Sequence, residues 1–452
     1  MKKSSLPLAI VGLGKTGLSI ARYLNKNKID FIAYDTREDL EITKDINLEV
    51  SNEKIVLGNF KKRYVDLHDN FIMSPGVNFN VEITNTINKL GKNILTDIDI
   101  FNQKKKNNVI CITGTNGKTT VTLLIEHMLN SLGKKAKAGG NIGFPVLDML
   151  EENYDYHVLE LSSFQLEITK EIRSSVSLIT NITEDHLDRH KTFQNYIDVK
   201  HKIFKNCKIS IINRLDKNVK KNNCKKEYTF GKDEPTNEND FGIKKKNNIS
   251  YIMHNDNELL NNKEFSLIGN HNYTNISSAL AVIHALGLNL RKAAKSVKTF
   301  KCVEHRMENF YKDKNLIWIN DSKSTNIDST ISAINSLEDN IVLLMGGRSK
   351  SDNYKQLDEV LHGKVKNLVL FGESRNLIKQ NIFSINSISL AENIEEAAKK
   401  ANIAAKLLSE KTSANVYILL SPACSSYDAF QSFEERGDKF KNYILEKYKL
   451  NK

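Results

Sequence analysis

A glycine-rich loop in the first third of the chain has the residue types of a phosphate-binding site. It reads Gly114-Thr115-Asn116-Gly117-Lys118-Thr119-Thr120 and follows the apolar segment 109–112 directly. In such loops the backbone N–H groups point at phosphate oxygens, the lysine reaches the terminal phosphates and the next hydroxyl binds magnesium. The loop therefore predicts ATP binding, and its phosphate and magnesium residues are Gly114, Asn116, Gly117, Lys118, Thr119 and Thr120.

The loop is shorter than the common GxxxxGK[ST] pattern, because only two residues separate Gly114 from Gly117. A glycine turn that merely joins a strand to a helix is the alternative. Glycine, lysine and threonine seldom follow a buried strand together by accident, which favours the phosphate site.

The length of 452 residues exceeds one compact core and predicts three domains. No apolar run approaches the roughly 20 residues needed to span a bilayer, and the N-terminus shows no signal-peptide pattern. We therefore expect a cytoplasmic protein without membrane insertion.

Charge and cysteine content narrow the class of partner. The formal charge of +12 comes from lysines spread along the chain, without a basic stripe that aromatic residues interrupt. This pattern predicts anionic small substrates and no nucleic acid. The five cysteines are scattered and form no CxxC, which predicts reduced thiols, and none has the surroundings of a nucleophile.

The elements that must position the loop alternate between strands and helices. We expect an α/β fold with an N-terminal Rossmann-like domain (1–96), a central P-loop ATPase-like domain with a mostly parallel sheet (97–302) and a C-terminal Rossmann-like domain (303–452). Segment 206–265 reads as charged, asparagine-rich loops and short strands at the periphery. In the last domain we expect strands at 316–319, 341–345, 368–371 and 416–420, each ending in a polar loop.

The first domain opens with a second glycine pattern. Strand 8–11 runs into Gly12-Leu13-Gly14-Lys15-Thr16-Gly17, and strand 31–34 ends at Asp35. Taken alone, this pattern is typical of NAD binding, although it is weak evidence. A third strand, 71–73, ends at Ser74-Pro75-Gly76, so three loops converge on one ligand at the same sheet edge.

Four further residues of the central domain are candidates for chemistry, and two of them, Glu160 and His186, stand where its strands end. Glu160 could hold the magnesium of the phosphate loop, or be a solvated carboxylate. His186 and His190 are one helical turn apart, which allows zinc with a third ligand and equally a hydrogen-bonded structural histidine. Lys200 would be read as a solvated surface lysine from its spacing alone.

Taken together, the phosphate loop, Gly139-Gly140-Asn141-Ile142-Gly143, segments 160–165 and 183–189 and the motif Gly269-Asn270-His271-Asn272-Tyr273-Thr274-Asn275 resemble the Mur ligase family of ATP-dependent peptidoglycan precursor enzymes. Segments 320–326 and 421–437 resemble the members that add D-glutamate. The resemblance is ordered and runs the length of the chain.

This resemblance implies that the first domain holds a UDP-sugar rather than NAD, through Leu13, Gly14, Lys15, Thr16, Asp35, Thr36, Arg37, Ser74, Pro75, Gly76, Asn141 and Ser163. It implies ATP contacts beyond the loop at Asn272, Asn275, Arg306, Asp321 and Lys323. For D-glutamate it implies Thr325, Lys350, Ser426 and Phe433, whose cation and hydroxyl donors suit carboxylates.

The resemblance also implies two magnesium ions, one near Thr119 and Glu160 and the other near His186 and a carbamylated Lys200. Carbon dioxide would turn the lysine from a cation that repels magnesium into an oxygen ligand that attracts it. Lys118, His186 and Lys200 are the implied catalytic residues.

The implied reaction joins D-glutamate to UDP-N-acetylmuramoyl-L-alanine through an acyl phosphate, and we expect a monomer. Another Mur-type ligase or a folylpolyglutamate-type ligase is the enzyme alternative, although the latter generally begins with its ATPase domain. A nucleotide-regulated binding protein would need the loop but neither Lys200 nor the cluster at Thr325, Lys350 and Ser426.

Overall fold

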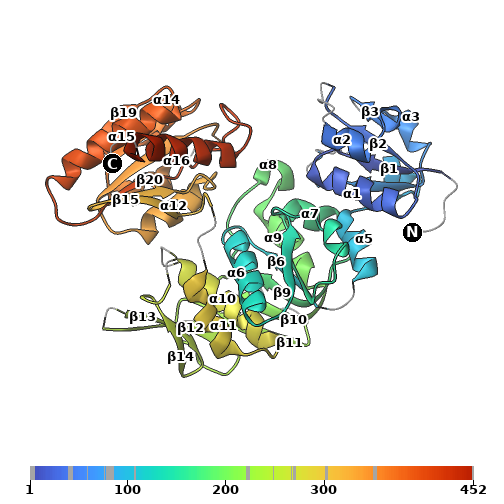
Figure 1. Cartoon of the computed structure of the whole chain (residues 1–452), viewed down its shortest axis with the longest axis horizontal. Helices are drawn as coiled ribbons and strands as arrows, with labels where there is room; N and C mark the ends of the chain where they lie inside the picture. The colour runs from blue at the N-terminus through green and yellow to red at the C-terminus, as the bar shows by residue number, and fades with distance from the viewer. Residues whose placement is uncertain are drawn as a thin grey trace. The chain divides into compact units, whose positions relative to one another are not determined.

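The computed structural model describes residues 6–38, 44–58, 60–75, 77, 86–105, 108–219, 224–247, 249–265, 267, 271–300, 304–349 and 354–449. It confirms the α/β class with three mostly parallel sheets (Figure 1). The chain forms two compact units, Met1–Asn261 with Ile276–Val297 and Asn262–Asn275 with Lys298–Lys452. Within the described residues, no helix has both the length and the apolar character that a bilayer crossing demands.

The first sheet is wholly parallel, and its order is β3-β2-β1-β4-β5. Its strands are β1 (Leu8–Val11), β2 (Phe31–Asp35), β3 (Ile55–Leu57), β4 (Asn70–Met73) and β5 (Asn93–Leu95), and its helices are α1 (Lys15–Lys26), α2 (Lys44–Glu49) and α3 (Lys62–Val65). Alternate residues of β1 face opposite sides, so Leu8 and Ile10 pack with α1 while Ala9 and Val11 join a second apolar cluster.

The central sheet has the order β14-β13-β12-β11-β10-β9-β6-β8-β7. Its strands are β6 (Val109–Thr113), β7 (Ala136–Gly140), β8 (Tyr156–Glu160), β9 (Arg173–Ile179), β10 (Asn206–Asn213), β11 (Lys226–Phe230), β12 (Asp240–Lys246), β13 (Ile249–His254) and β14 (Asn257–Asn261). The pairs β12–β13 and β13–β14 are antiparallel and the other pairs are parallel.

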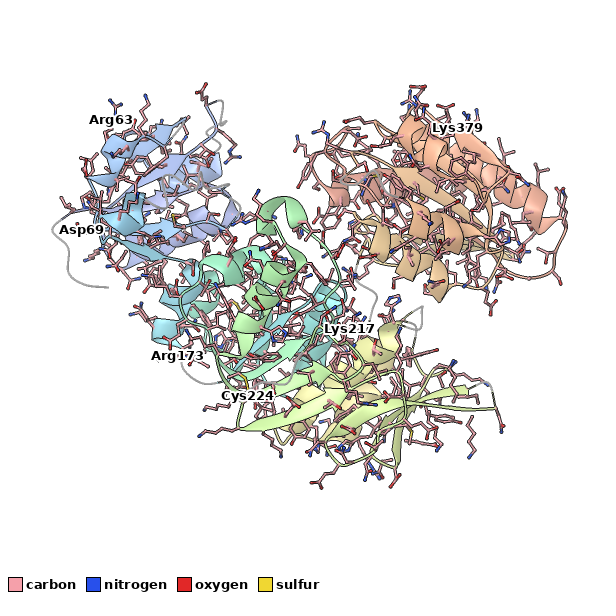
Figure 2. The ribbon with its side chains drawn as sticks, turned by 180° about the vertical axis from the view of Figure 1, so that it is seen from behind. Arg63, Asp69, Arg173, Lys217, Cys224 and Lys379 are labelled. Atoms are coloured by element: carbon pink, nitrogen blue, oxygen red, sulfur yellow. A yellow bond between two sulfur atoms is a disulfide. The ribbon has the colours of Figure 1, made fainter. Side chains whose placement is uncertain are left out.

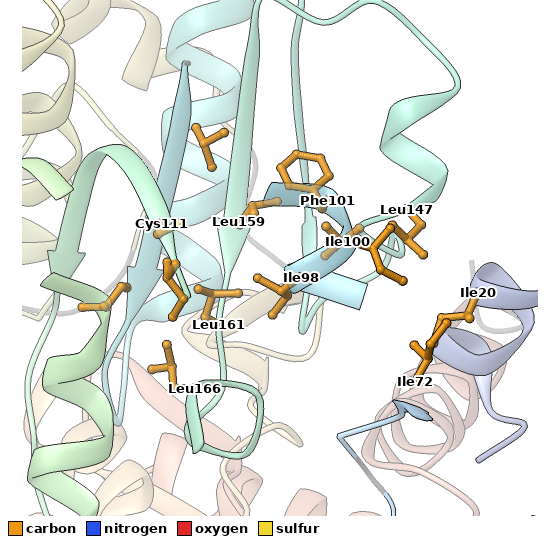
Figure 3. Close-up of a cluster of buried hydrophobic side chains, with 14 of the residues drawn as sticks. Ile20, Ile72, Ile98, Ile100, Phe101, Cys111, Leu147, Leu159, Leu161 and Leu166 are labelled. Atoms are coloured by element: carbon orange, nitrogen blue, oxygen red, sulfur yellow. The ribbon is translucent and has the colours of Figure 1, made fainter. Parts of the chain in front are cut away.

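The helices around this sheet are α5 (Asp97–Lys104), α6 (Lys118–Ser131), α7 (Ser163–Ile168), α8 (Leu187–His190), α9 (Phe193–His201), α10 (His271–Ala285) and α11 (Leu290–Ser296). A Thr96 capping box begins α5. Ile98 and Phe101 of this helix belong to the apolar cluster that includes Leu159 of β8 and Cys111 of β6 (Figure 3). The phosphate loop follows strand β6, which is buried along its whole length.

The short strands expected at 206–265 are present, but the expectation that loops dominate this segment is wrong, because its strands extend one end of the main sheet. Strands β10 and β11 continue the parallel ladder from β9, and β12 to β14 complete it as a meander. Asn247 and Asn255 adopt positive φ between these last strands, so part of the asparagine content reflects tight hairpin turns. The many charged residues of this segment made its strands hard to recognise in the sequence. The apolar residues on the buried side of these strands include Ile211, Phe230, Phe241 and Ile252.

The expectation that the cysteines are all reduced is also wrong. Cys207 and Cys224 form a disulfide, with their Cα atoms 6.1 Å apart. The parallel register of β10 and β11 pairs Ile209 with Lys226. Two positions earlier on each segment, the same register brings Cys207 opposite Cys224. Cys224 is labelled in Figure 2. Cys111 and Cys424 are buried free thiols whose pKa values burial raises to about 12 and about 11, as expected for cysteines that are poor nucleophiles.

The third sheet, in the second unit, has the order β15-β16-β20-β17-β18-β19, with β15 antiparallel to β16 and the rest parallel. Its strands are β15 (Glu308–Asp313), β16 (Leu316–Asn320), β17 (Ile341–Gly346), β18 (Val365–Phe371), β19 (Ile388–Leu390) and β20 (Val416–Leu420). Its helices are α12 (Ile327–Ser336), α13 (Lys355–Leu361), α14 (Arg375–Asn381), α15 (Ile394–Ser409) and α16 (Phe433–Lys449).

Two apolar layers cover this sheet. Ile319 and Leu343 pack with residues of α12, α13 and α14 on one face. Trp318 and Leu344 pack with α15 and α16 on the other. Strands β16, β17, β18 and β20 match the sequence expectation closely, and their C-terminal ends lie at the same edge of the sheet.

Candidate active site

The phosphate loop has a backbone that only glycine permits at its first position. Gly114 has φ +149°, and a β-carbon there would lie 1.9 Å from Thr180 Oγ1. Gly117 has φ +84° and immediately precedes α6, so the loop ends at the N-terminus of that helix, where the backbone N–H groups point away from the helix. Together with the buried strand before it, this geometry forms an anion cradle at a helix N-terminus.

Lys118 lies against the loop that carries it. Its Nζ donates to the carbonyl oxygens of Gly114 at 2.8 Å and Thr115 at 2.7 Å. Thr119 and Thr120 are buried in the first turn of α6. The ammonium group of Lys118 therefore lies at the loop, where it could form an ion pair with a bound phosphate.

Residues at the end of β9 hold the loop, and sequence reasoning did not assign them. Asn116 N donates to Asn181 Oδ1 at 2.9 Å, while Thr180 Oγ1 donates to Asn116 O at 2.6 Å. Thr115 N donates to Asn181 O at 2.8 Å. Their position in the sequence could have identified them, because Thr180 and Asn181 directly follow β9, the strand that pairs with β6.

Lys200 is completely buried, so the reading of it as a solvated surface lysine is wrong. Its Nζ donates to Gly114 O at 2.8 Å and lies 4.6 Å from the centre of the Tyr196 ring. Burial, and then the charge of Lys118, lowers the pKa of Lys200 well below its usual value, against the opposing effect of Asp185 and Glu160. Burial therefore favours the neutral form of the amine, which is the form that can add carbon dioxide.

Glu160 lies beside the loop because β8 pairs with β6, with Glu160 opposite Ile112. Its carboxylate is buried, and Oε1 accepts from Asn141 Nδ2 at 2.8 Å. Within the described residues, Oε2 is buried without a hydrogen-bond partner. A buried carboxylate oxygen in this state fits an oxygen-seeking cation such as magnesium.

Within the described part of the chain, no three His, Cys, Asp or Glu side chains gather into a metal-binding group. The structure thus does not join His186 and Glu160 into one such cluster. The charges of Asp185 and Glu160 nevertheless act on Lys200, whose pKa they raise against the larger lowering by burial. A magnesium site here would combine Glu160 with hydroxyl or carbamate oxygens, which suits the residues present.

His186 has a left-handed backbone, φ 54°, and its ring packs 4.8 Å from the Phe164 ring. Its Nε2 lies 3.6 Å from Asp185 Oδ2, which places the ring beside the preceding carboxylate. His190 shares a hydrogen bond with Ser163 Oγ at 3.0 Å, which fits a structural histidine. This contact also shows that Ser163, assigned to the UDP-sugar, is buried against His190.

The first-domain residues gather at the C-terminal ends of β1, β2 and β4. Asp35 accepts from Leu13 N at 2.8 Å and from Arg37 Nε at 2.8 Å. Burial would raise the pKa of Asp35, but the hydrogen bonds from Arg37 and Leu13 outweigh it and lower the pKa. Both carboxylate oxygens therefore fix the two loops to each other.

The other first-domain assignments differ in exposure. Ser74 N donates to Val11 O at 2.9 Å, which ties the β4 loop to β1. A β-carbon on Gly14 would meet no atom within 4 Å, so the described surroundings leave room there. Lys15 and Thr36 are exposed, Thr16 and Pro75 are partly buried, and Gly76 lies outside the described residues.

In the second unit, Asp321 lies just after β16 and is buried. Its carboxylate accepts from Met307 N at 3.1 Å and Ser421 Oγ at 2.9 Å. Burial raises the pKa of Asp321 to about 6, against the lowering effect of Ser324 and Arg306. Asn275 Nδ2 donates to Asn272 Oδ1 at 3.0 Å, which pairs two residues assigned to ATP on the first turn of α10.

Three of the residues assigned to D-glutamate, Thr325, Ser426 and Phe433, lie in or next to the loops that follow strands β16 and β20 of the third sheet. Lys323 Nζ, assigned to ATP, lies 5.3 Å from the centre of the Phe433 ring, and Thr325 N donates to Lys323 O at 3.0 Å. Ser426 is buried in the loop after β20. Lys350 lies outside the described residues.

Sequence reasoning missed Arg436, whose guanidinium is fully buried. It donates to Ser322 O at 2.8 Å, Cys424 O at 3.1 Å and Gly346 O at 3.3 Å, and also to Ser322 Oγ at 3.0 Å. These acceptors belong to the ends of three different strands. Arg436 therefore fixes the loops after β16, β17 and β20 to one another.

Comparison with known proteins gives matches along most of the chain. Residues 7–96 match the family described as Mur ligase MurD-like, N-terminal domain. Residues 112–283 match the Mur ligase middle domain, and residues 305–424 match the Mur ligase, glutamate ligase domain.

Two curated relatives carry the name UDP-N-acetylmuramoylalanine--D-glutamate ligase. The protein of Legionella pneumophila (strain Paris) is 36% identical over 445 residues, covering 96% of this chain and 98% of its own. That of Coxiella burnetii (strain Dugway 5J108-111) is 34% identical over 446 residues, covering 97% and 98%. The solved UDP-N-acetylmuramate-alanine ligase of Thermotoga maritima aligns with TM-score 0.61 at 19% identity over 99% of this chain and 100% of that one, which supports the shared fold.

Proposed function

Because the chain belongs to the Mur ligase family, we propose that it is the ATP-dependent ligase that joins D-glutamate to UDP-N-acetylmuramoylalanine in peptidoglycan precursor synthesis. The observation that carries this proposal is the similarity at 36% identity over 96% of the chain to a ligase of that name. The phosphate loop with the buried Lys200 beside it supports the same reaction.

The proposed chemistry proceeds through an acyl phosphate. ATP phosphorylates the alanyl carboxylate, which converts a poor leaving oxygen into a good one. The amine of D-glutamate then attacks the carbonyl and phosphate leaves, while His186, next to Asp185, is the candidate to accept the proton of the amine. Lys118 and Arg306 offset the charge that the phosphates bring.

Lys200 has the chemistry to become a carbamate. Its neutral amine adds to carbon dioxide and releases one proton, which yields a carboxylate on the nitrogen. Two magnesium ions, one held by Thr119 and Glu160 and the other by His186 and this carbamate, would neutralise phosphate charge. The buried, partnerless Oε2 of Glu160 within the described residues supports this assignment.

The roles of the remaining residues also belong to this proposal. The UDP-sugar would lie on the loops after β1, β2 and β4, and D-glutamate would bind Thr325, Lys350, Ser426 and Phe433. We further propose three functional domains, 1–96, 97–302 and 303–452, acting as a monomer in the cytoplasm, where nucleotide-linked precursors and ATP are available.

A phosphate-release assay tests this function. Purified protein receives magnesium, bicarbonate, ATP and UDP-N-acetylmuramoyl-L-alanine with a panel of D- and L-amino acids. Release should depend on D-glutamate. Release that depends instead on L-lysine or diaminopimelate would move the chain to another Mur-type activity, and no release with any amino acid would refute the proposal.

Lys200→Ala separates a ligase from a nucleotide-binding module. The variant should lose turnover and recover part of it with added short carboxylates. The exposed Lys217 provides the matched control, since Lys217→Ala removes a lysine of the same unit that has no assigned role. Full activity in Lys200→Ala would contradict the role of the carbamate.

A further inference from the structure

The turn that carries Arg306 has an unusual backbone. His305 and Met307, the residues on either side of Arg306, adopt positive φ values of 60° and 46°. Left-handed conformations of residues other than glycine cost about 1–3 kcal/mol each and persist only where the surroundings fix them. The surroundings of this turn must therefore supply compensating contacts.

Two hydrogen bonds fix the backbone of the turn, one to a carboxylate and one from a backbone N–H group. Met307 N donates to Asp321 Oδ1 at 3.1 Å, and Lys323 N donates to His305 O at 3.0 Å. These contacts tie the turn to the loop after β16. They leave the N–H group of His305 and its side chain to be held from elsewhere.

Glu308 provides that contact. Its Oε2 accepts from His305 N at 3.0 Å and from Asn320 Nδ2 at 3.3 Å, and Asn320 Nδ2 also lies 3.0 Å from His305 Nδ1. The other oxygen, Oε1, accepts from Lys441 Nζ of α16. The side chain of Glu308 is 12% exposed, so this ion pair is well shielded from water.

Helix α16 faces the turn with two residues one helical turn apart. Besides Lys441, it presents Gly437, where a β-carbon would lie 2.3 Å from His305 Nδ1. The small residue lets the imidazole approach, and the lysine fixes the carboxylate. Helix α16 therefore contacts the turn at both His305 and Glu308.

We propose that the ion pair of Glu308 and Lys441 is a positioning element that holds turn 304–308 in its left-handed form and so directs Arg306 at the nucleotide phosphates. This inference rests on the proposed function, in which Arg306 contacts ATP. Neither residue of the pair needs to touch a substrate. Its loss should therefore weaken nucleotide binding while the affinity for D-glutamate stays unchanged.

The test uses the full-length protein and two independent variants. Glu308→Gln keeps the size and one acceptor oxygen but removes the charge, and Lys441→Met removes the ammonium from the other end. Lys441→Arg should restore the pair. Lys439→Ala removes an exposed lysine of the same helix and is the matched control.

ADP binding is measured by calorimetry without the other substrates, so the result does not depend on turnover. We expect a Kd about tenfold higher for Glu308→Gln and Lys441→Met, and a value within about twofold of wild type for Lys441→Arg and Lys439→Ala. The KM for D-glutamate should stay within about twofold of wild type in all four variants.

A double-mutant cycle with Arg306→Ala shows whether the pair acts through Arg306. In that background Glu308→Gln should have no further effect on ADP binding. A further tenfold loss there, or unchanged ADP binding in both single variants, would overturn the inference. Parallel losses of ADP affinity, D-glutamate affinity and stability would also overturn it, because they indicate a merely structural role. Failure of the wild type to use D-glutamate would instead count against the proposed function.

Discussion

Removal of the Arg436 guanidinium should destabilise the second unit without unfolding the first. This group is fully buried and makes four hydrogen bonds to the ends of three strands. Burial lowers the pKa of Arg436 to about 10, so the side chain remains charged at neutral pH. In Arg436→Ala the four acceptors lose this donor inside a cavity.

The magnitude follows from those acceptors. A buried polar group left without its partner costs about 1–3 kcal/mol, and water entering the cavity recovers part of this, which leaves about 4 kcal/mol in total. With a urea m-value of about 2 kcal/mol per molar, the unfolding midpoint should fall by about 2 M. Arg436→Lys keeps the charge but has fewer donors, so its midpoint should lie in between.

The chain contains a suitable probe for this measurement. Its single tryptophan, Trp318, is buried in β16, and its ring centroid lies 5.8 Å from that of Phe440 on α16. Tryptophan fluorescence therefore reports unfolding of the second unit. Lys439→Ala, on the same helix, should shift the midpoint by less than about 0.3 M. Equal midpoints for wild type and Arg436→Ala would refute the reasoning.

Three further expectations concern other parts of the chain. The folded-state pKa of Asp321, about 6, exceeds its ordinary value of 3.8, so the folded state holds the proton more tightly; stability should fall by about 2.4 kcal/mol from pH 4 to pH 7, and urea curves of Asp321→Asn should lack this component. Gly114→Ala places a methyl group 1.9 Å from Thr180 Oγ1 and should abolish ADP binding in calorimetry; retained affinity would contradict the strained cradle. Reduction of the Cys207–Cys224 disulfide, which spans 17 residues, should cost about 3 kcal/mol by circular dichroism in urea, and Cys207→Ser should match the reduced protein.

The strand, turn and helix start that form the phosphate loop were predictable from the sequence, because each depends on a local pattern of residues. The apolar run before Gly114 and the glycines within the loop specified a buried strand, a turn and a helix start. The same reasoning found β1, β17 and β20 with correct or nearly correct bounds. In each case the signal lay within about ten consecutive residues.

Features that depend on contacts between distant segments of the chain could not be predicted from the sequence. The burial of Lys200 depends on the packing of α9 beneath the loop, and nothing within the helix distinguishes this lysine from the many exposed ones. Arg436 likewise receives its acceptors from segments 12 to 114 positions away. The Cys207–Cys224 disulfide required the register of β10 with β11, which a search for CxxC spacing does not detect.

The carbonyl oxygen of Gly114 accepts from both Lys118 and Lys200, each at 2.8 Å, and this sharing suggests an order of events. Burial, and then the charge of Lys118, lowers the pKa of Lys200. Once a triphosphate draws Lys118 away, that repulsion weakens and the amine becomes easier to protonate. We therefore expect carbon dioxide to be captured more readily before the nucleotide arrives than afterwards, so that cellular bicarbonate would charge the enzyme ahead of each encounter with ATP.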